Sequence, residues 1–142
     1  MVSPEEFESR EEWAQALLAQ IQTFDADLVV LAGFMRILPG VFVNALTPHL
    51  INMHPALLPL YPGAHAVRDA LTAGATVTGA TVHVVDEGVD TGPIIRQVEV
   101  AIEPADTEET LHERIKVVER DLIVATVTAI AQSQVNLEEI AR

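Results

Sequence analysis

The sequence predicts an α/β protein in which helices flank a mostly parallel, twisted sheet. Helical and strand-like segments alternate along the first half of the chain, an order typical of that class. The early strand candidates are short apolar runs without alternation, as in parallel strands buried on both faces. Two longer strand-like segments follow one another later in the chain and predict a hairpin near its C-terminal end.

The first predicted helix begins with Ser9 and Glu12, which have the spacing of a capping box. Apolar residues then recur at helical spacing: Trp13, Leu17, Ile21 and Phe24. The β-branched apolar run at 27–32 predicts the first strand, and Gly33 ends it.

Three short elements follow. Residues 39–45 predict a helix with a proline near its start. Residues 50–53 predict a second strand, which a His-Pro pair ends, and a proline-rich loop comes next. Residues 65–73 predict another helix, with Gly74 as its stop.

The hairpin is predicted from residues 76–86 and 93–102, with a turn-rich stretch between them. Asp106 and Glu109 suggest a second capping box, from which the last helix runs to about Ser133, followed by a polar tail. One apolar stripe marks the buried face of this helix: Leu111, Ile115, Val118, Leu122 and Ala125.

Composition narrows the class further. The chain has 142 residues, 49% of them hydrophobic, a formal net charge of −13 and no cysteine. The length suits one domain, the hydrophobicity excludes intrinsic disorder, and the acidic charge argues against nucleic acid. No apolar run approaches the roughly 20 residues of a membrane span, and no leader opens the chain. We therefore expect a soluble, cytoplasmic domain that binds neither nucleic acid nor membrane. Its high apolar content suggests burial against a surface that this chain does not contain.

Three polar residues are the main candidates for chemistry. Asn52 and His54 are two apart at the end of a strand, so their side chains point to the same face, where ligands of open α/β sheets bind. Asp90 lies in the loop between the hairpin strands. An amide and an imidazole can hold an oxyanion, and a carboxylate can orient the imidazole. The alternative is ordinary loop capping and turn chemistry.

The other histidines have different expected roles, and several common catalytic motifs are absent. His65 is a candidate for the edge of the cleft, whereas His83 is interpreted as structural and His49 and His112 as surface residues. A metal site is not expected, because no pair of candidate ligands has a recognised metal-binding spacing. Dinucleotide, phosphate-loop and nucleophile-elbow motifs are absent, as is cysteine, which favours direct transfer or hydrolysis over an acyl-enzyme.

Four blocks of sequence together resemble one family. They lie at residues 33–38, 51–59, 61–63 and 79–95. In order and spacing they are similar to the folate-dependent formyltransferases, and the resemblance runs from about residue 7 to 131. The string after the Asn-x-His element favours the branch that acts on glycinamide ribonucleotide over methionyl-tRNA formyltransferase and formyltetrahydrofolate deformylase. The resemblance implies a Rossmann-like fold.

The resemblance implies transfer of a formyl group from 10-formyltetrahydrofolate to the amine of glycinamide ribonucleotide, in purine biosynthesis. It implies that Asn52 and His54 hold the oxygen of the tetrahedral intermediate. Asp90 would position His54 and, through water, help to move protons. No metal is implied.

The resemblance also implies two binding walls. The expected folate wall comprises Met35, Arg36, Ile37, Leu38, Val85, Asp86, Glu87, Gly88, Val89 and Asp90. The expected ribonucleotide side comprises Gly63, His65 and Glu119, with a solvated surface role as the alternative for Glu119.

The chain departs from the family in one respect. The family begins with a strand and a Gly/Ser-rich loop that holds the ribonucleotide phosphate, and neither is present. Residues 1–142 are therefore interpreted as a single, partial catalytic domain with uncovered edges, open to homo-oligomer formation. Alone, it is expected to bind the ribonucleotide poorly and to turn over slowly or not at all. The alternatives are a deformylase-type hydrolase and a non-catalytic folate-binding fragment.

Overall fold

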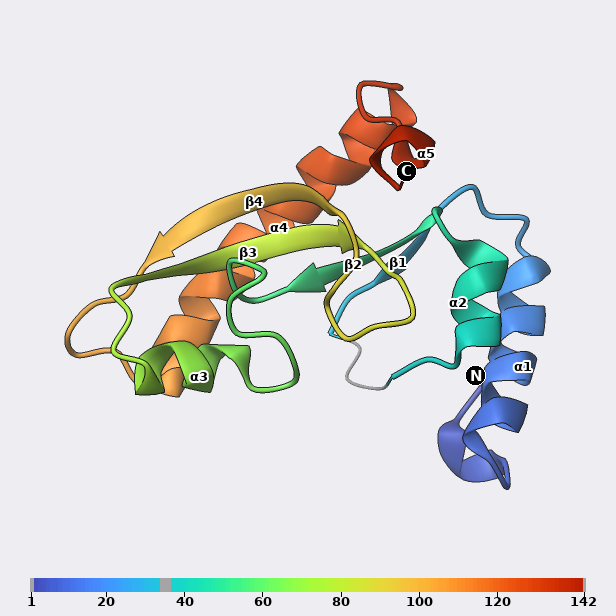
Figure 1. Ribbon diagram of the computed structural model, residues 1–142, viewed down its shortest axis with the longest axis horizontal. Coiled ribbons are helices and arrows are strands. Elements are labelled where there is room, and N and C mark those ends of the chain that lie inside the picture. Colours follow the sequence, from blue (N-terminus) through green and yellow to red (C-terminus); the bar gives the residue numbers. More distant parts are fainter. Residues whose placement is uncertain (1, 34–36, 142) are drawn as a thin grey trace.

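The computed structural model describes residues 2–33 and 37–141. Its elements, in chain order, are η1 (Pro4–Glu6), α1 (Arg10–Gln22), β1 (Val29–Leu31), α2 (Gly40–Leu46), β2 (Leu50–His54), α3 (Ala66–Thr72), β3 (Val77–Val84), β4 (Ile94–Ala101), α4 (Glu108–Ala131) and α5 (Leu137–Ile140). Figure 1 shows one sheet with the long helix α4 across it and the pair α1 and α2 at one end.

The strands form a four-stranded sheet in the order β1-β2-β3-β4. The α/β class, the flanking helices and the hairpin of β3 and β4 are as predicted. The strand directions differ from the expectation, because the sheet is mixed: β1 and β2 are parallel, whereas β3 is antiparallel to both β2 and β4. An unbroken apolar run reports burial on both faces of a strand but not its direction.

Helix α4 forms the main core by packing across β3 and β4. Leu111, Ile115 and Leu122 are buried as predicted, but Ala125 is exposed and Thr126 takes the buried position. The buried residues of this cluster are Ile51, Met53, Val67, Ala80, Val82, Val84, Val100, Leu111, Ile115, Leu122 and Leu137. The core thus fixes α4 against the hairpin.

A second, smaller core joins α1 and α2 to the sheet. The buried residues of this cluster are Trp13, Ala14, Leu38, Phe42, Val43 and Leu50. Ser9 caps α1 as predicted, its hydroxyl accepting a 3.1 Å hydrogen bond from the Glu12 amide. Phe24 lies beyond the end of α1 and is 72% exposed, so it is not part of the predicted apolar face.

The start of α4 differs by one residue from the prediction. Thr107 is the N-cap and forms a capping box with Thr110. Asp106 instead pairs with the Arg114 guanidinium at 2.7 Å, which holds the pKa of that carboxyl well below its usual range. The expected polar tail contains α5, whose cap Asn136 is itself polar.

Among the described residues, β1 and β4 are the edge strands of the sheet, and no further strand pairs with either of them. Apolar side chains on these strands are partly exposed, including Val30, Ile94 and Val98. The expected homo-oligomer stays a prediction. No helix in the described part of the chain is long and apolar enough to cross a membrane.

Thr78 offers a test of the core. Its buried hydroxyl has no hydrogen-bond partner among the described residues, so its desolvation is uncompensated. We expect Thr78→Val to raise the free energy of unfolding by about 1 kcal/mol in urea denaturation.

Thr81→Val is the matched control on the same strand. The Thr81 hydroxyl donates to the Ala56 carbonyl at 2.7 Å and accepts from the Leu58 amide at 3.2 Å. This substitution should therefore lower stability. An equal change in the free energy of unfolding of the two variants would contradict the conclusion that the Thr78 hydroxyl is buried without a partner.

Candidate functional site

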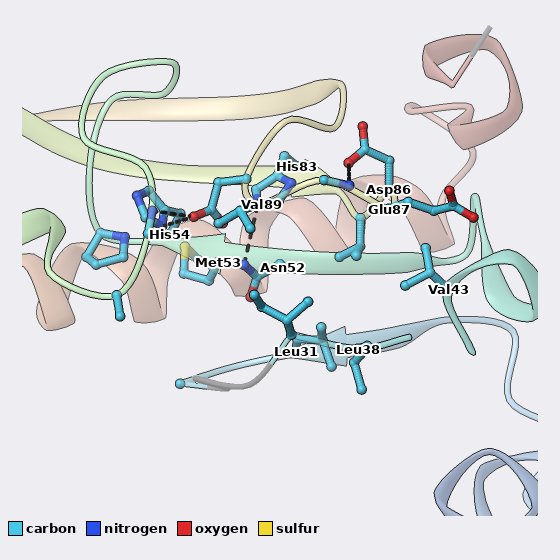
Figure 2. Close-up of a pocket in the computed structure, with 18 of the residues that line it drawn as sticks. Leu31, Leu38, Val43, Asn52, Met53, His54, His83, Asp86, Glu87 and Val89 are labelled. Atoms are coloured by element: carbon cyan, nitrogen blue, oxygen red, sulfur yellow. Dashed lines mark hydrogen bonds and ion pairs between the residues drawn. The ribbon is translucent and has the colours of Figure 1, made fainter. Parts of the chain in front are cut away.

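A cavity of about 360 Å³ lies beside the carboxyl end of β2. Leu31, Leu38 and Val43 form an apolar part of its wall from β1, the segment before α2 and α2 itself (Figure 2). The polar side chains of the wall come from β2, β3, the loop after β3 and α4. The apolar members are Leu31, Ile37, Leu38, Val43, Met53, Val85 and Val89, and the polar members include Asn52, His54, His83, Asp90, His112 and Glu119. The cavity therefore presents two chemically different surfaces.

Strand β2 places Asn52 and His54 on the cavity wall. Because the two residues are separated by one position, the strand directs both side chains to the same face. His54 is only 4% exposed. Across the antiparallel pairing, Asn52 lies opposite His83 of β3, which brings a second imidazole into the site.

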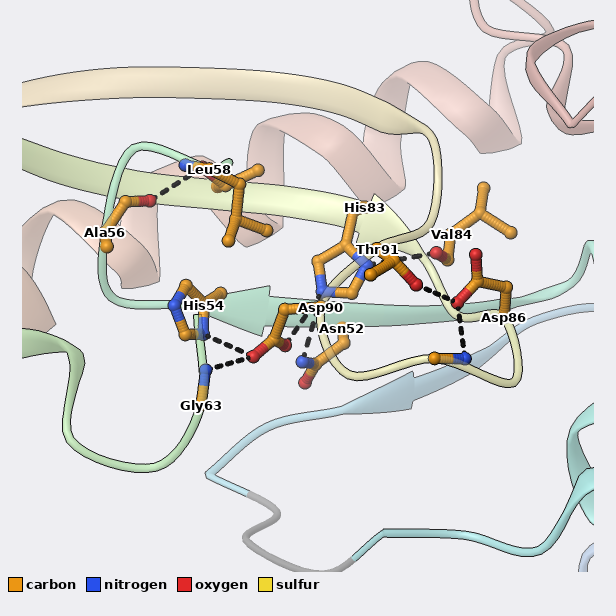
Figure 3. A network of polar contacts seen from close by, with 12 residues as sticks. Asn52, His54, Ala56, Leu58, Gly63, His83, Val84, Asp86, Asp90 and Thr91 are labelled. Atoms are coloured by element: carbon orange, nitrogen blue, oxygen red, sulfur yellow. Dashed lines mark hydrogen bonds and ion pairs between the residues drawn. The ribbon is translucent and has the colours of Figure 1, made fainter. Parts of the chain in front are cut away.

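The Asp90 carboxylate lies between the two histidines (Figure 3). Its Oδ2 atom is 3.4 Å from His54 Nδ1, and its Oδ1 atom is 3.5 Å from His83 Nε2. The Gly63 amide donates a 2.8 Å hydrogen bond to Oδ2. One carboxylate thus joins β2, β3 and the loop after β2.

The surroundings of Asp90 favour its ionised form. Burial of the carboxyl raises the pKa of Asp90, but hydrogen bonds from His83 and Gly63 and the charges of His54 and His83 together outweigh it. The pKa therefore lies below the ordinary 3.8. Asp90 consequently stays an acceptor at neutral pH.

Both ring nitrogens of His54 face acceptors. Nε2 is 2.8 Å from the Tyr61 carbonyl, and Nδ1 faces the Asp90 carboxylate. A carbonyl and an ionised carboxylate only accept, so the doubly protonated ring satisfies both contacts. The site thus places the His54 imidazole between the Tyr61 carbonyl and the Asp90 carboxylate.

His83 was interpreted from sequence as structural, but the structure places it on the cavity wall. Its Nδ1 donates to the Val84 carbonyl at 3.0 Å. Its Nε2 lies 3.3 Å from Asn52 Nδ2 and also faces Asp90. In the neutral ring, Nε2 accepts from the Asn52 amide, and in the charged ring it donates to Asp90. Only the strand register could have revealed this pairing.

Most of the expected folate wall lines the cavity. The lining members are Ile37, Leu38, Val85, Asp86, Glu87, Gly88, Val89 and Asp90. Met35 and Arg36 lie outside the described residues. Asp86 accepts hydrogen bonds from Gly88 and Thr91 within its own turn. Glu87 accepts a 2.6 Å hydrogen bond from Asn44 of α2, which ties this loop to the apolar wall.

Only part of the expected ribonucleotide side lines the cavity. Gly63 and Glu119 line the cavity, whereas the exposed His65 does not. Burial raises the pKa of Glu119, and Lys116 offsets part of that effect. His112, expected on the surface, also lines the cavity.

Among the described residues, no cluster of three or more acidic or histidine side chains is arranged to hold a metal ion.

Comparison with known proteins gives one consistent result. The family model described as "Formyl transferase" matches residues 1–127. The chain is 55% identical over 123 residues to the phosphoribosylglycinamide formyltransferase of Mycobacterium tuberculosis. It is 50% identical over 115 residues, 81% of this chain and 8% of the relative, to the trifunctional purine biosynthetic protein adenosine-3 of Drosophila pseudoobscura pseudoobscura.

The solved structures agree with these relatives. Glycinamide ribonucleotide transformylase 1 from Symbiobacterium toebii superposes with a TM-score of 0.89 at 40% identity, covering 92% of this chain and 62% of that one. The match to the Mycobacterium tuberculosis protein covers 87% of this chain but only 57% of the relative. The chain thus spans little more than half the length of that curated relative.

The raised pKa of Glu119 predicts how stability depends on pH. A carboxyl with a folded-state pKa above its unfolded value destabilises the fold where it is ionised. We expect Glu119→Gln to be more stable than the unmodified chain at about pH 7. The difference should shrink as pH falls through the raised pKa towards the ordinary 4.5.

Glu113→Gln is the control on the same helix, measured by urea denaturation at several pH values. The hydrogen bond from Lys116 and its charge lower the pKa of Glu113, so the ionised form is favoured and this substitution should bring no gain at about pH 7. A loss of stability in Glu119→Gln at that pH would contradict the conclusion that burial raises the pKa of Glu119.

Proposed function

Because the chain belongs to the formyl transferase family, we propose that it transfers the formyl group of 10-formyltetrahydrofolate to the amine of glycinamide ribonucleotide, a step of purine biosynthesis. The observation that carries the proposal is the cluster of Asn52, His54 and Asp90 on the wall of a cavity with one apolar and one polar surface. The substrates are water-soluble metabolites, for which we expect a cytoplasmic site of action.

The two surfaces suit the two substrates. Leu38, Val43 and Val85 offer an apolar surface to the folate ring system, and backbone groups of the loop that contains Gly88 can pair with its polar edge. The α4 wall, with Glu119, offers a carboxylate to sugar hydroxyls. The reacting groups would then meet at the cluster between these surfaces.

The reaction needs stabilisation of a developing charge. The amine of the acceptor attacks the formyl carbon, a carbon–nitrogen bond forms, and the formyl oxygen becomes an oxyanion. Asn52 and His54 supply N–H donors for this oxygen. Collapse of the intermediate breaks the bond to the folate nitrogen, while the proton lost by the attacking amine goes to that leaving nitrogen.

The contacts of His54 and Asp90 fit these roles. His54 Nε2 can exchange its hydrogen bond to the Tyr61 carbonyl for one to the oxyanion, while Nδ1 stays against Asp90. The Asp90 carboxylate thereby stabilises the charged ring through the reaction. Its second oxygen faces His83 and the cavity, where it can accept a proton through water.

His54→Ala tests this assignment. Loss of one oxyanion donor costs roughly 100-fold to 1,000-fold in rate, so we expect at least that loss in formation of the formylated ribonucleotide. Folate binding, which rests on the apolar wall, should change little. The measurements are product formation by chromatography and folic acid binding by fluorescence titration.

The exposed His49 provides the matched control, because His49→Ala also removes an imidazole but leaves the cavity wall unchanged. Equal loss of activity and folate binding in His54→Ala would contradict the assigned role. Release of formate without an acceptor would favour the hydrolase instead. Folate binding with neither reaction would favour a non-catalytic fragment. The match covers only 57% of the Mycobacterium tuberculosis relative, which agrees with that alternative.

A further inference from the structure

Helix α4 carries a second cavity-lining residue besides Glu119. His112 lines the same cavity and is partly buried. It precedes Glu119 by seven residues, so the two side chains lie on the same face of the helix, about 10 Å apart along its axis. Figure 1 shows the first part of α4 beside α3, which follows the loop that contains Gly63.

The charges on the described cavity wall are mostly negative. The lining acids are Asp86, Glu87, Asp90 and Glu119, and the lining groups that can carry positive charge are His54, His83 and His112. Both His54 and His83 are engaged by Asp90 and by backbone carbonyls. An anionic acceptor substrate therefore finds few donors among the described lining side chains.

His112 differs from the other two histidines because its ring makes no hydrogen bond or ion pair with another described residue. An imidazole always offers at least one N–H donor, and His112 lines the cavity from the helix that also carries Glu119. A partly buried donor without a partner is satisfied when a ligand oxygen reaches it.

We propose that His112 is a binding residue for the acceptor substrate and donates a hydrogen bond to an oxygen of its sugar-phosphate part. The proposal deepens the proposed function and rests on it for the identity of the acceptor. Glu119 accepts from hydroxyl groups, and His112 donates further along the same helix. An extended sugar phosphate along α4 meets both residues, whereas the folate is bound by the apolar wall.

The test is an NMR titration with glycinamide ribonucleotide at up to millimolar concentration, which detects weak binding. The Hε1 resonance of His112, assigned by its loss in His112→Ala, should shift on addition of the ribonucleotide. His112→Ala should weaken acceptor binding roughly tenfold and leave folic acid binding unchanged. His112→Gln, which keeps a donor, should recover part of the affinity, and His49→Ala should bind like the unmodified chain.

The corresponding riboside, which lacks the phosphate, separates the two sources of oxygen. A His112 effect that persists with the riboside assigns the contact to the ribose, and one that disappears assigns it to the phosphate. No shift of the His112 resonance, no loss in His112→Ala, an equal loss in His49→Ala, or no binding to the unmodified chain would overturn the proposal. A chain that binds acceptor through His112 yet forms no formylated product would overturn the proposed function alone.

Discussion

The carboxylate of Asp90 is the point at which three segments of the chain meet. It faces His54 from β2, His83 from β3 and the amide of Gly63 from the loop after β2. Without this anion, the buried His54 ring would lose an acceptor at Nδ1, and so would the charged form of His83 at Nε2. The proposed chemistry uses the same contact, because the carboxylate orients the His54 ring and stabilises its charged form while the ring donates to the oxyanion.

The loop after β2 reaches Asp90 because the hairpin holds it. Thr81 of β3 binds both the Ala56 carbonyl and the Leu58 amide, and the Gln97 amide of β4 donates to the Leu58 carbonyl at 2.7 Å. Core packing of α4 fixes the hairpin in turn. The geometry of the site is therefore a consequence of the main core, and the loop delivers the Tyr61 carbonyl and the Gly63 amide to their partners.

Local signals in the sequence predicted most elements and placed Asn52, His54 and Asp90 near one sheet end. The i, i+2 rule needs only the existence of a strand, and Ser9 caps α1 through a purely local pattern. The sequence did not reveal that β3 runs antiparallel to β2 or that Asn52 lies opposite His83. The direction and register of strand pairing depend on contacts between segments that are distant in sequence. His112 was predicted to be a surface residue for a related reason. It lies outside the apolar stripe of α4, and only the packing of α4 beside the cavity places it on the cavity wall.

The central claim is that Asp90 is held ionised by its contacts with His83, Gly63 and His54. The most direct measurement is the pH titration of the Asp90 side-chain carboxyl by ¹³C NMR in the folded chain, alone and with His83→Phe. The account predicts a midpoint below 3.8 in the unmodified chain and a higher midpoint in the variant, where burial is no longer offset by that hydrogen bond. A midpoint at or above 3.8 in the unmodified chain, or no change in the variant, would contradict it.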